Sequence, residues 1–249
     1  HHNHSDLVIK ALNKGKAVYV EKPLALDMQS ITDIEESIYR SENPKLFIGF
    51  NRRFSKSAQF IKQKLIHSPA NSINLRFSVP PLDSDHWTNI KEIGGGRIVG
   101  EAVHGIDLAC YLFDSLPQSI SASAPVDKTN NMAKDNQVFL NINFANGSHA
   151  SLQYFSEANQ ILSKERIEVH GEGNSYILED FKMLRFLEGS QDKSKTFSSG
   201  KGHKESLSIF FDYVRDKSQN PFTWEEIKAV SKAAITAQDH INSGQQHNV

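Results

Sequence analysis

The feature that most constrains the fold is a short apolar run ending in a charged pair and a proline, Val18-Tyr19-Val20-Glu21-Lys22-Pro23. Its β-branched and aromatic residues follow Gly15, as expected for a buried parallel strand entered from a tight turn. Ligands of open α/β sheets bind just beyond the carboxyl ends of the strands, where Lys22 stands. Pro23 keeps Lys22 out of helical space, and a cis Lys22–Pro23 bond would fix the direction of the ammonium group. A solvated Glu21–Lys22 ion pair is the alternative interpretation.

Helix signals flank this strand on both sides. A helix is expected at 6–14 with Ser5 as its N-cap, and a second at 28–39 with Asp27 as its N-cap. Another apolar strand is expected at 45–50. This alternation predicts an α/β (α+β) chain in which residues 1–50 are the last units of a doubly wound Rossmann sheet that binds a dinucleotide.

A dinucleotide-binding fold also needs a Gly-x-Gly-x-x-Gly turn between its first strand and its first helix. The glycine clusters at 94–96 and 171–173 neither follow a strand nor open a helix with that spacing. The sequence therefore predicts the carboxyl-terminal part of a longer enzyme. Such a part lacks the first half of the Rossmann domain, and we expect it to bind a nicotinamide cofactor weakly or not at all by itself.

From Asn51 the composition changes, which predicts a second domain over 51–249. A helix with Ser55 as its N-cap and a strand at 73–79 come first. The following elements are then expected: a loop at 83–96, a buried helix at 98–113, strands at 120–124, 137–144, 148–155, 165–170, 175–179 and 183–187, a polar loop at 190–202, and helices at 204–217 and 224–242. This order indicates an open, mostly antiparallel β-sheet with helices on one face.

Composition excludes several classes of partner. The chain has 249 residues and a formal net charge of -1, with its basic residues dispersed, so no nucleic-acid partner is expected. No apolar run is long enough for a membrane span, and the first residues given do not show a charged-then-apolar signal pattern, so we expect no membrane association and a cytoplasmic location. Cys110, the single cysteine, is expected in the core. The histidines are scattered, so no metal site is predicted.

A second candidate site follows three consecutive glycines, in Gly94-Gly95-Gly96-Arg97-Ile98-Val99-Gly100-Glu101-Ala102-Val103-His104-Gly105-Ile106-Asp107. On a regular helix, Glu101 and Asp107 each lie three residues from His104, within reach of its imidazole. A carboxylate there would hold the ring in one tautomer. The alternative is a core histidine that is satisfied by Asp107.

Together the two motifs resemble the glucose-fructose oxidoreductase / inositol dehydrogenase (Gfo/Idh/MocA) family. The segment from His4 to Ala25 is similar to the part of that family that carries its Glu-Lys-Pro signature, and the glycine-rich segment to its histidine motif. In the family, a carboxylate residue stands four positions before the histidine. That position is Gly100 here, and the next residue, Glu101, is expected to face elsewhere. Three further motifs resemble one subgroup of the family, in which this unit follows a zinc-type alcohol dehydrogenase half. They are Pro80-Pro81, Asp85-His86-Trp87 and Lys201-Gly202-His203.

The resemblance implies NAD- or NADP-dependent hydride transfer from a sugar-like or cyclitol secondary alcohol. Lys22 and His104 would be catalytic, with Glu101 and Asp107 in support. The cofactor-binding residues would be His4, Glu21, Lys22, Pro23 and Asn51. The substrate-binding residues would be Arg52, Arg53, His86, Trp87 and His104, with Lys201 as a further candidate. A homo-oligomer would form through the open face of the sheet, covered by Ile142, Leu152, Tyr154 and Phe155.

Two other functions stay open at this point. One is a lyase or hydrolase that uses a tightly held NAD to oxidise its substrate transiently. The other is a non-catalytic dimerisation or substrate-sensing domain, and Gly100 in place of a carboxylate is its best support.

Overall fold

The computed structural model describes residues 1–249 except 82–85, 128–131, 134–136, 199 and 244–249. The amino-terminal elements are α1 (His4–Leu12), β1 (Val18–Val20), α2 (Met28–Arg40), β2 (Leu46–Ile48), the 3₁₀ turn η1 (Asn51–Phe54) and α3 (Lys56–Leu65). The middle of the chain forms β3 (Ser72–Ser78), η2 (Trp87–Asn89), α4 (Lys91–Gly94), η3 (Ile98–Ala102) and α5 (Val103–Phe113). The remaining elements are β4 (Pro117–Ser123), β5 (Val126–Asp127), β6 (Met132–Ala133), β7 (Gln137–Phe144), β8 (His149–Phe155), β9 (Glu165–Gly171), β10 (Asn174–Glu179), β11 (Met183–Glu188), β12 (Gln191–Thr196), α6 (His203–Val214) and α7 (Trp224–Ser243).

The amino-terminal unit is a parallel β1–β2 pair beside α1 and α2. Val18 pairs with Leu46 and Val20 with Ile48, so both strands end at the same edge. The Asp27 carboxylate accepts a hydrogen bond from the Ser30 backbone N–H, which confirms the predicted N-cap of α2. The predicted N-cap of α1 was wrong. Residue Asn3 already has helical backbone angles, so α1 begins at His4 and Ser5 is buried inside it.

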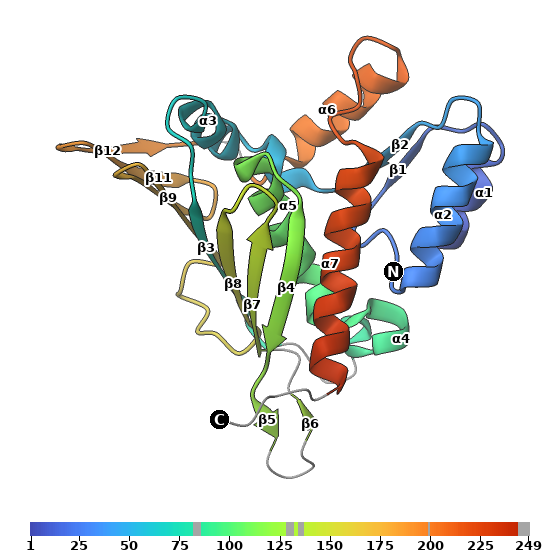
Figure 1. Ribbon diagram of the computed structural model, residues 1–249, viewed down its shortest axis with the longest axis horizontal. Helices are drawn as coiled ribbons and strands as arrows, with labels where there is room; N and C mark the ends of the chain where they lie inside the picture. Colours follow the sequence, from blue (N-terminus) through green and yellow to red (C-terminus); the bar gives the residue numbers. More distant parts are fainter. Residues whose placement is uncertain (82–85, 128–131, 134–136, 199, 244–249) are drawn as a thin grey trace.

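The large sheet has, within the described ranges, eight strands in the order β12-β11-β10-β9-β3-β8-β7-β4. All neighbours are antiparallel except β3 and β8, which run parallel. Figure 1 shows this sheet on one side of the molecule, α5 and α7 in the middle, and the β1–β2 pair with α1 and α2 on the other side. The fold is therefore mixed α/β with an open, mostly antiparallel sheet covered by helices on one face, as predicted.

The residues expected on the open face of the sheet were assigned to the wrong face. Ile142, Leu152 and Tyr154 are buried in the core, because α5 packs tightly on β8. A Cβ atom added at Gly105 of α5 would lie only 2.2 Å from Leu152 Cδ1. Of the four, Phe155 is the exception. It is half-buried. The centroid of its ring lies 5.6 Å from that of Phe139, a residue of β7 whose side chain is on the open face of the sheet.

One strand of the large sheet was missed, besides the short pair β5 and β6. Residues 190–202 were expected to form a polar loop, but Gln191–Thr196 is an exposed edge strand paired with β11. Its side chains are polar throughout, so no hydrophobic alternation marks it, and the pairing with β11 decides its conformation. The expected loop at 83–96 likewise contains the short helical elements η2 and α4 in its described part.

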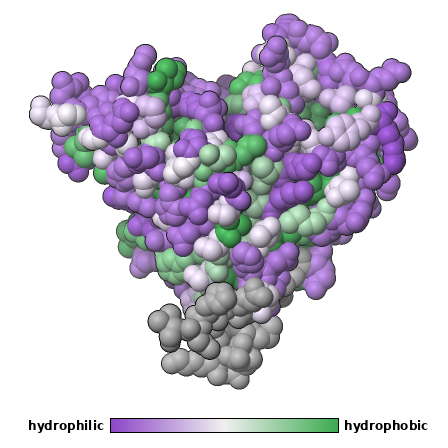
Figure 2. All heavy atoms as spheres, in the orientation of Figure 1, coloured by the Kyte–Doolittle hydropathy of each residue, from purple (hydrophilic) through white to green (hydrophobic). Residues whose placement is uncertain are grey.

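The surface seen in Figure 2 is mainly hydrophilic, and its hydrophobic residues lie in separate spots. In the part of the chain that the structure describes, no helix has both the length and the apolar character needed to cross a bilayer. Cys110 is buried in the core, as predicted.

Candidate functional site

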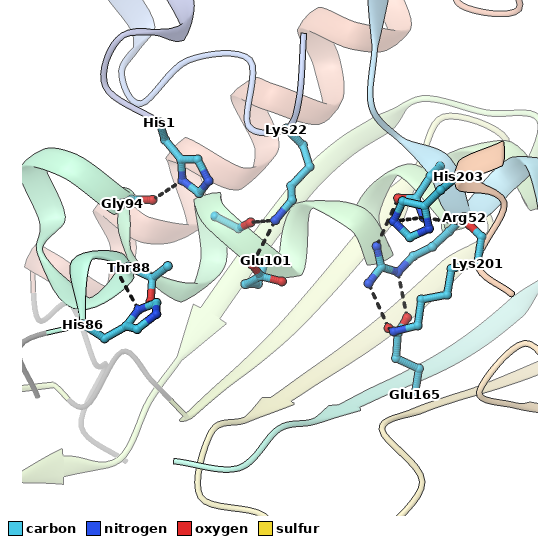
Figure 3. Close-up of polar contacts among 12 residues, drawn as sticks. His1, Lys22, Arg52, His86, Thr88, Gly94, Glu101, Glu165, Lys201 and His203 are labelled. Atoms are coloured by element: carbon cyan, nitrogen blue, oxygen red, sulfur yellow. Dashed lines mark hydrogen bonds and ion pairs between the residues drawn. The ribbon is translucent and has the colours of Figure 1, made fainter. Parts of the chain in front are cut away.

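Lys22 stands at the carboxyl end of β1 and reaches across to the helix that carries His104 (Figure 3). The Lys22–Pro23 bond is cis. The Lys22 Nζ donates hydrogen bonds to the Gly100 carbonyl at 2.6 Å and to Glu101 Oε1 at 2.9 Å. Its side chain is 14% exposed, so the charge is held partly out of water beside its carboxylate. The two motifs of the sequence thus meet in space.

Glu101 faces Lys22, which corrects the expectation that it faces elsewhere. The expectation assumed regular α-helical spacing, whereas Ile98–Ala102 forms a π-helical turn. The Val103 N–H donates to the Ile98 carbonyl, five residues earlier, so this turn holds one more residue than an α-turn. The wider turn changes the direction in which residue 101 points.

Position 100 itself has little room for a side chain. A Cβ atom at Gly100 would lie 3.1 Å from the Gly94 carbonyl oxygen. A Cβ atom at Gly94 would lie 2.6 Å from the Thr88 backbone, so the chain folds tightly on itself here. The lack of a carboxylate at position 100 therefore reflects close packing, and Glu101 supplies the acidic group beside Lys22.

His104 lies in α5 and is 4% exposed. Burial lowers the pKa of its imidazole well below the usual value, and the nearby charges of Arg52 and Lys22 lower it further. Its Nδ1 is buried without a hydrogen-bond partner. The prediction that Asp107 or Glu101 orients this ring was wrong, because Asp107 binds Arg53 and Glu101 binds Lys22.

Arg52, whose charge acts on His104, belongs to a buried ion cluster with Glu165 and Lys201 (Figure 3). Its Nε and Nη2 donate to the Glu165 carboxylate at 2.7 and 2.8 Å. Lys201 Nζ donates to the same carboxylate. Burial alone would raise the pKa of Glu165, but Arg52 and Lys201 outweigh it and lower the pKa to about 2. The carboxylate is therefore ionised at neutral pH.

Arg53, the neighbour of Arg52 on η1, forms ion pairs that do not include Glu165 or Glu101. Its Nη2 donates to Asp107 Oδ1 at 2.5 Å, and its Nη1 lies 3.4 Å from Glu226 Oε1. It lines a cavity of about 650 Å³ whose other walls include Lys62 and Tyr111. The structure thus separates Arg53 and Asp107 from the Lys22 site, where the sequence interpretation had grouped them.

The predicted cofactor-side residues lie around the ends of β1 and β2. The His4 Nδ1 is 2.7 Å from the Pro23 carbonyl oxygen. Asn51 is buried, and its Nδ2 donates to the Lys201 carbonyl oxygen at 2.7 Å. Glu21 is exposed and folds over Gly49, where an added Cβ atom would meet its carboxylate at 2.8 Å.

Trp87 begins η2 and His86 is its N-cap; Figure 3 shows His86 apart from Lys22, beside Thr88. The His86 Nδ1 is 2.8 Å from Thr88 Oγ1, and Trp87 is 44% exposed. Asp85, quoted with them in the subgroup motif, falls outside the described residues. No hydrogen bond or ion pair between described residues joins His86 or Trp87 to Lys22 or His104.

Glu165 and His203 were not predicted as site residues. Glu165 begins β9 in the same inward register as Ile167 and Val169, and a charged residue in phase with two buried apolar ones is a signal for a buried ion pair. His203 starts α6, and its Nε2 lies 3.2 Å from Asn51 Nδ2. No local pattern in the sequence marked His203 beyond the Lys201-Gly202-His203 motif.

Comparison with known proteins gives matches over most of the chain. The family model described as GFO/IDH/MocA C-terminal domain matches residues 70–177. The inositol 2-dehydrogenase of Rhizobium meliloti is 27% identical over 224 residues, which is 78% of this chain and 66% of that protein. The myo-inositol 2-dehydrogenase of Thermotoga maritima is 23% identical over 248 residues, 97% of this chain and 69% of that protein.

Solved structures share the fold. The crystal structure of aldose-aldose oxidoreductase from Caulobacter crescentus complexed with glycerol has a TM-score of 0.83 at 15% identity, covering 100% of this chain and 76% of that one. This chain thus spans about two thirds to three quarters of the length of these proteins.

Proposed function

The chain belongs to the Gfo/Idh/MocA family, and from this premise we propose that it is the substrate-side part of a nicotinamide-dependent oxidoreductase acting on a sugar-like or cyclitol secondary alcohol. One observation carries the proposal. The Lys22 ammonium group lies beside the helix of a buried, neutral His104 whose Nδ1 has no partner. A cation that can bind an alcohol oxygen and a base that can accept its proton are the two groups that such a reaction requires.

The residues present fit the nicotinamide end of a cofactor site. The carboxyl ends of β1 and β2 lie side by side and lead into Lys22 and Asn51, the position at which open α/β sheets bind their ligands. A buried nitrogen without a partner, such as His104 Nδ1, fits a group that receives its hydrogen bond from a bound molecule. When bound, NAD or NADP would supply the hydride acceptor. Glu21, Pro23 and His4 would lie on the cofactor side.

The protein groups then perform the proton chemistry. His104 is neutral at neutral pH because burial and the neighbouring cations lower its pKa, so it is ready to accept the proton of the alcohol. Lys22 donates a hydrogen bond to the same oxygen and stabilises the negative charge that develops on it. Glu101 and the Gly100 carbonyl hold the Lys22 amine in place.

The non-catalytic alternative rested on Gly100 in place of a carboxylate. Glu101 supplies that carboxylate beside Lys22, so this support is lost. Three finer statements are part of the same proposal. The chain divides at about residue 50 into a dinucleotide-binding part and a substrate-binding part. A glycine-rich half precedes it in the whole protein, as in the subgroup fused to a zinc-type alcohol dehydrogenase. Copies associate through the open sheet face, where Phe139 is 39% exposed.

The first test is a calorimetric titration of NAD(H) and NADP(H) into this chain and into a version extended upstream. We expect only the extended protein to bind. In that protein, His104→Asn and Lys22→Met should lower kcat/KM for a cyclitol at least 100-fold, the usual size of a lost acid–base group. The matched controls are His170→Asn on the outer part of β9 and Lys16→Met, an exposed position, and both should retain activity. Failure of both proteins to bind a cofactor would contradict the proposal.

A further inference from the structure

Two cationic side chains share one buried carboxylate apart from the Lys22–Glu101 pair (Figure 3). Arg52 and Lys201 both donate to Glu165, which is 1% exposed. Lys22 and Glu101 form a separate pair of opposite charges. The group around Glu165 therefore carries one positive charge more than it has carboxylates, and we call these three residues, Arg52, Glu165 and Lys201, the Glu165 cluster.

The excess charge is accessible. The Lys201 side chain is 24% exposed, whereas Glu165 is closed off beneath it. An ammonium group has three donors, and the Glu165 carboxylate takes one of those of Lys201. The Arg52 Nη1 has only a long contact of 3.5 Å, to Asn51 Oδ1. The exposed ammonium group of Lys201 is therefore the donor open to a ligand, with the buried Arg52 guanidinium behind it.

The backbone holds this cluster rigidly. Gly202 packs so closely on η1 that an added Cβ atom would lie 2.4 Å from the Asn51 carbonyl oxygen. The Asn51 side chain holds the Lys201 carbonyl from the same side at 2.7 Å. Cations fixed in this way lose little conformational entropy when they bind an anion. Such fixation suits a binding site better than a flexible surface lysine.

We propose that Lys201 and Arg52 bind a carboxylate of the substrate, so that the alcohol oxidised beside Lys22 and His104 belongs to a sugar acid. This inference rests on the proposed function. The net charge of the Glu165 cluster favours a carboxylate over a phosphate as the bound group. One excess positive charge matches the single negative charge of a carboxylate, whereas a phosphate monoester carries about −1.5 to −2 at pH 7. Figure 3 shows the Glu165 cluster and the Lys22–Glu101 pair beside the same helix, the one that carries His104. The proposal places one small molecule across both groups.

The competing interpretation is structural. Lys201 would then only neutralise Glu165, and its replacement would change stability without changing which sugars bind.

The test compares acidic and neutral sugars by calorimetric or NMR titration into this chain. The probes are D-glucuronate and D-galacturonate against D-glucose and D-galactose, with D-glucose 6-phosphate as the contrast. We expect an acid to bind at least tenfold more tightly than its neutral partner, and Lys201→Gln to remove that preference. Lys204→Gln, an exposed lysine three residues along, should keep it.

Equal binding of acids and neutral sugars, or a preference that survives Lys201→Gln, would overturn the inference. Tighter binding of the phosphate than of both acids would overturn it too, since the charge argument would then be wrong. These readouts need no cofactor. If a sugar acid binds but the extended protein does not oxidise it, only the proposed function is contradicted. If the extended protein oxidises a neutral polyol and acids do not bind, only this inference is contradicted.

Discussion

Two consecutive arginines on η1 have opposite surroundings. Arg53 is buried between two carboxylates, those of Asp107 and Glu226. Arg52 shares its carboxylate, Glu165, with a second cation that is partly open to solvent. A buried charge with matched partners stabilises one packing arrangement, whereas an excess charge at the surface is available to a ligand. Neighbouring residues of the same type thus have different roles because of what surrounds them.

The largest effect on stability is expected when the ion pair between Arg53 and Asp107 is broken. Asp107→Asn removes the nearer and buried one of the two carboxylates beside the Arg53 guanidinium and should lower the free energy of unfolding by about 3–5 kcal/mol. Urea unfolding measures this change. The control is Glu226→Gln, because Glu226 is 28% exposed and its contact is long, so less than about 1 kcal/mol should be lost. An equal loss in both variants would contradict the central role of the Asp107 pair.

Glu165→Gln should destabilise less, and in a pH-dependent way. The pKa of Glu165 is lowered from 4.5 to about 2, which corresponds to about 3 kcal/mol at neutral pH. A lowered carboxyl pKa adds stability above the unfolded-state value, and this part is lost as the pH falls from about 4.5 towards 2. The difference between wild type and variant, measured by urea unfolding from pH 7 down to pH 3, should therefore shrink on acidification. If the difference in unfolding free energy between wild type and Glu165→Gln does not change with pH, Glu165 is not ionised in the folded protein.

The pKa of the His104 imidazole should show directly how the nearby cations act on the ring. Its pKa is lowered by burial and by Arg52 and Lys22, so the ring should stay neutral at pH 6.5, where a free histidine is half protonated. NMR titration of the ring carbons measures this. Because the unfolded chain binds that proton more readily, His104 contributes a loss of stability as the pH falls below about 6.5. Lys201→Gln removes one nearby cation and should raise the His104 pKa slightly.

The smallest effect on stability is expected at Glu101. Its side chain is 33% exposed, so Glu101→Gln should change the free energy of unfolding by less than about 1 kcal/mol. In the extended protein the same change should still lower turnover, because Lys22 loses the carboxylate that holds it. A large loss of stability would instead assign Glu101 to the structural group that includes Asp107.

Much of the candidate site could be predicted from the sequence. Lys22 and His104 were found by their motifs, and the structure brings these motifs together. The partners of the carboxylates were not found. A regular helix was assumed at 98–113, so the π turn that directs Glu101 towards Lys22 was missed. The pairing of Arg52 with Glu165 spans 113 residues and has no local signal apart from the inward register of Glu165.

The sequence by itself determined the local elements. The Asp27 and Ser55 side chains cap their helices as predicted, and Gly147 has the positive φ that its hairpin turn requires. These features depend on residues a few positions apart, so the local sequence is sufficient to specify them. The tertiary structure alone decided which face of β8 is covered and which arginine faces the site, because both depend on packing between elements distant in the chain. The charge excess beside His104 was decided in the same way, since it arises where η1, β9 and the segment before α6 meet.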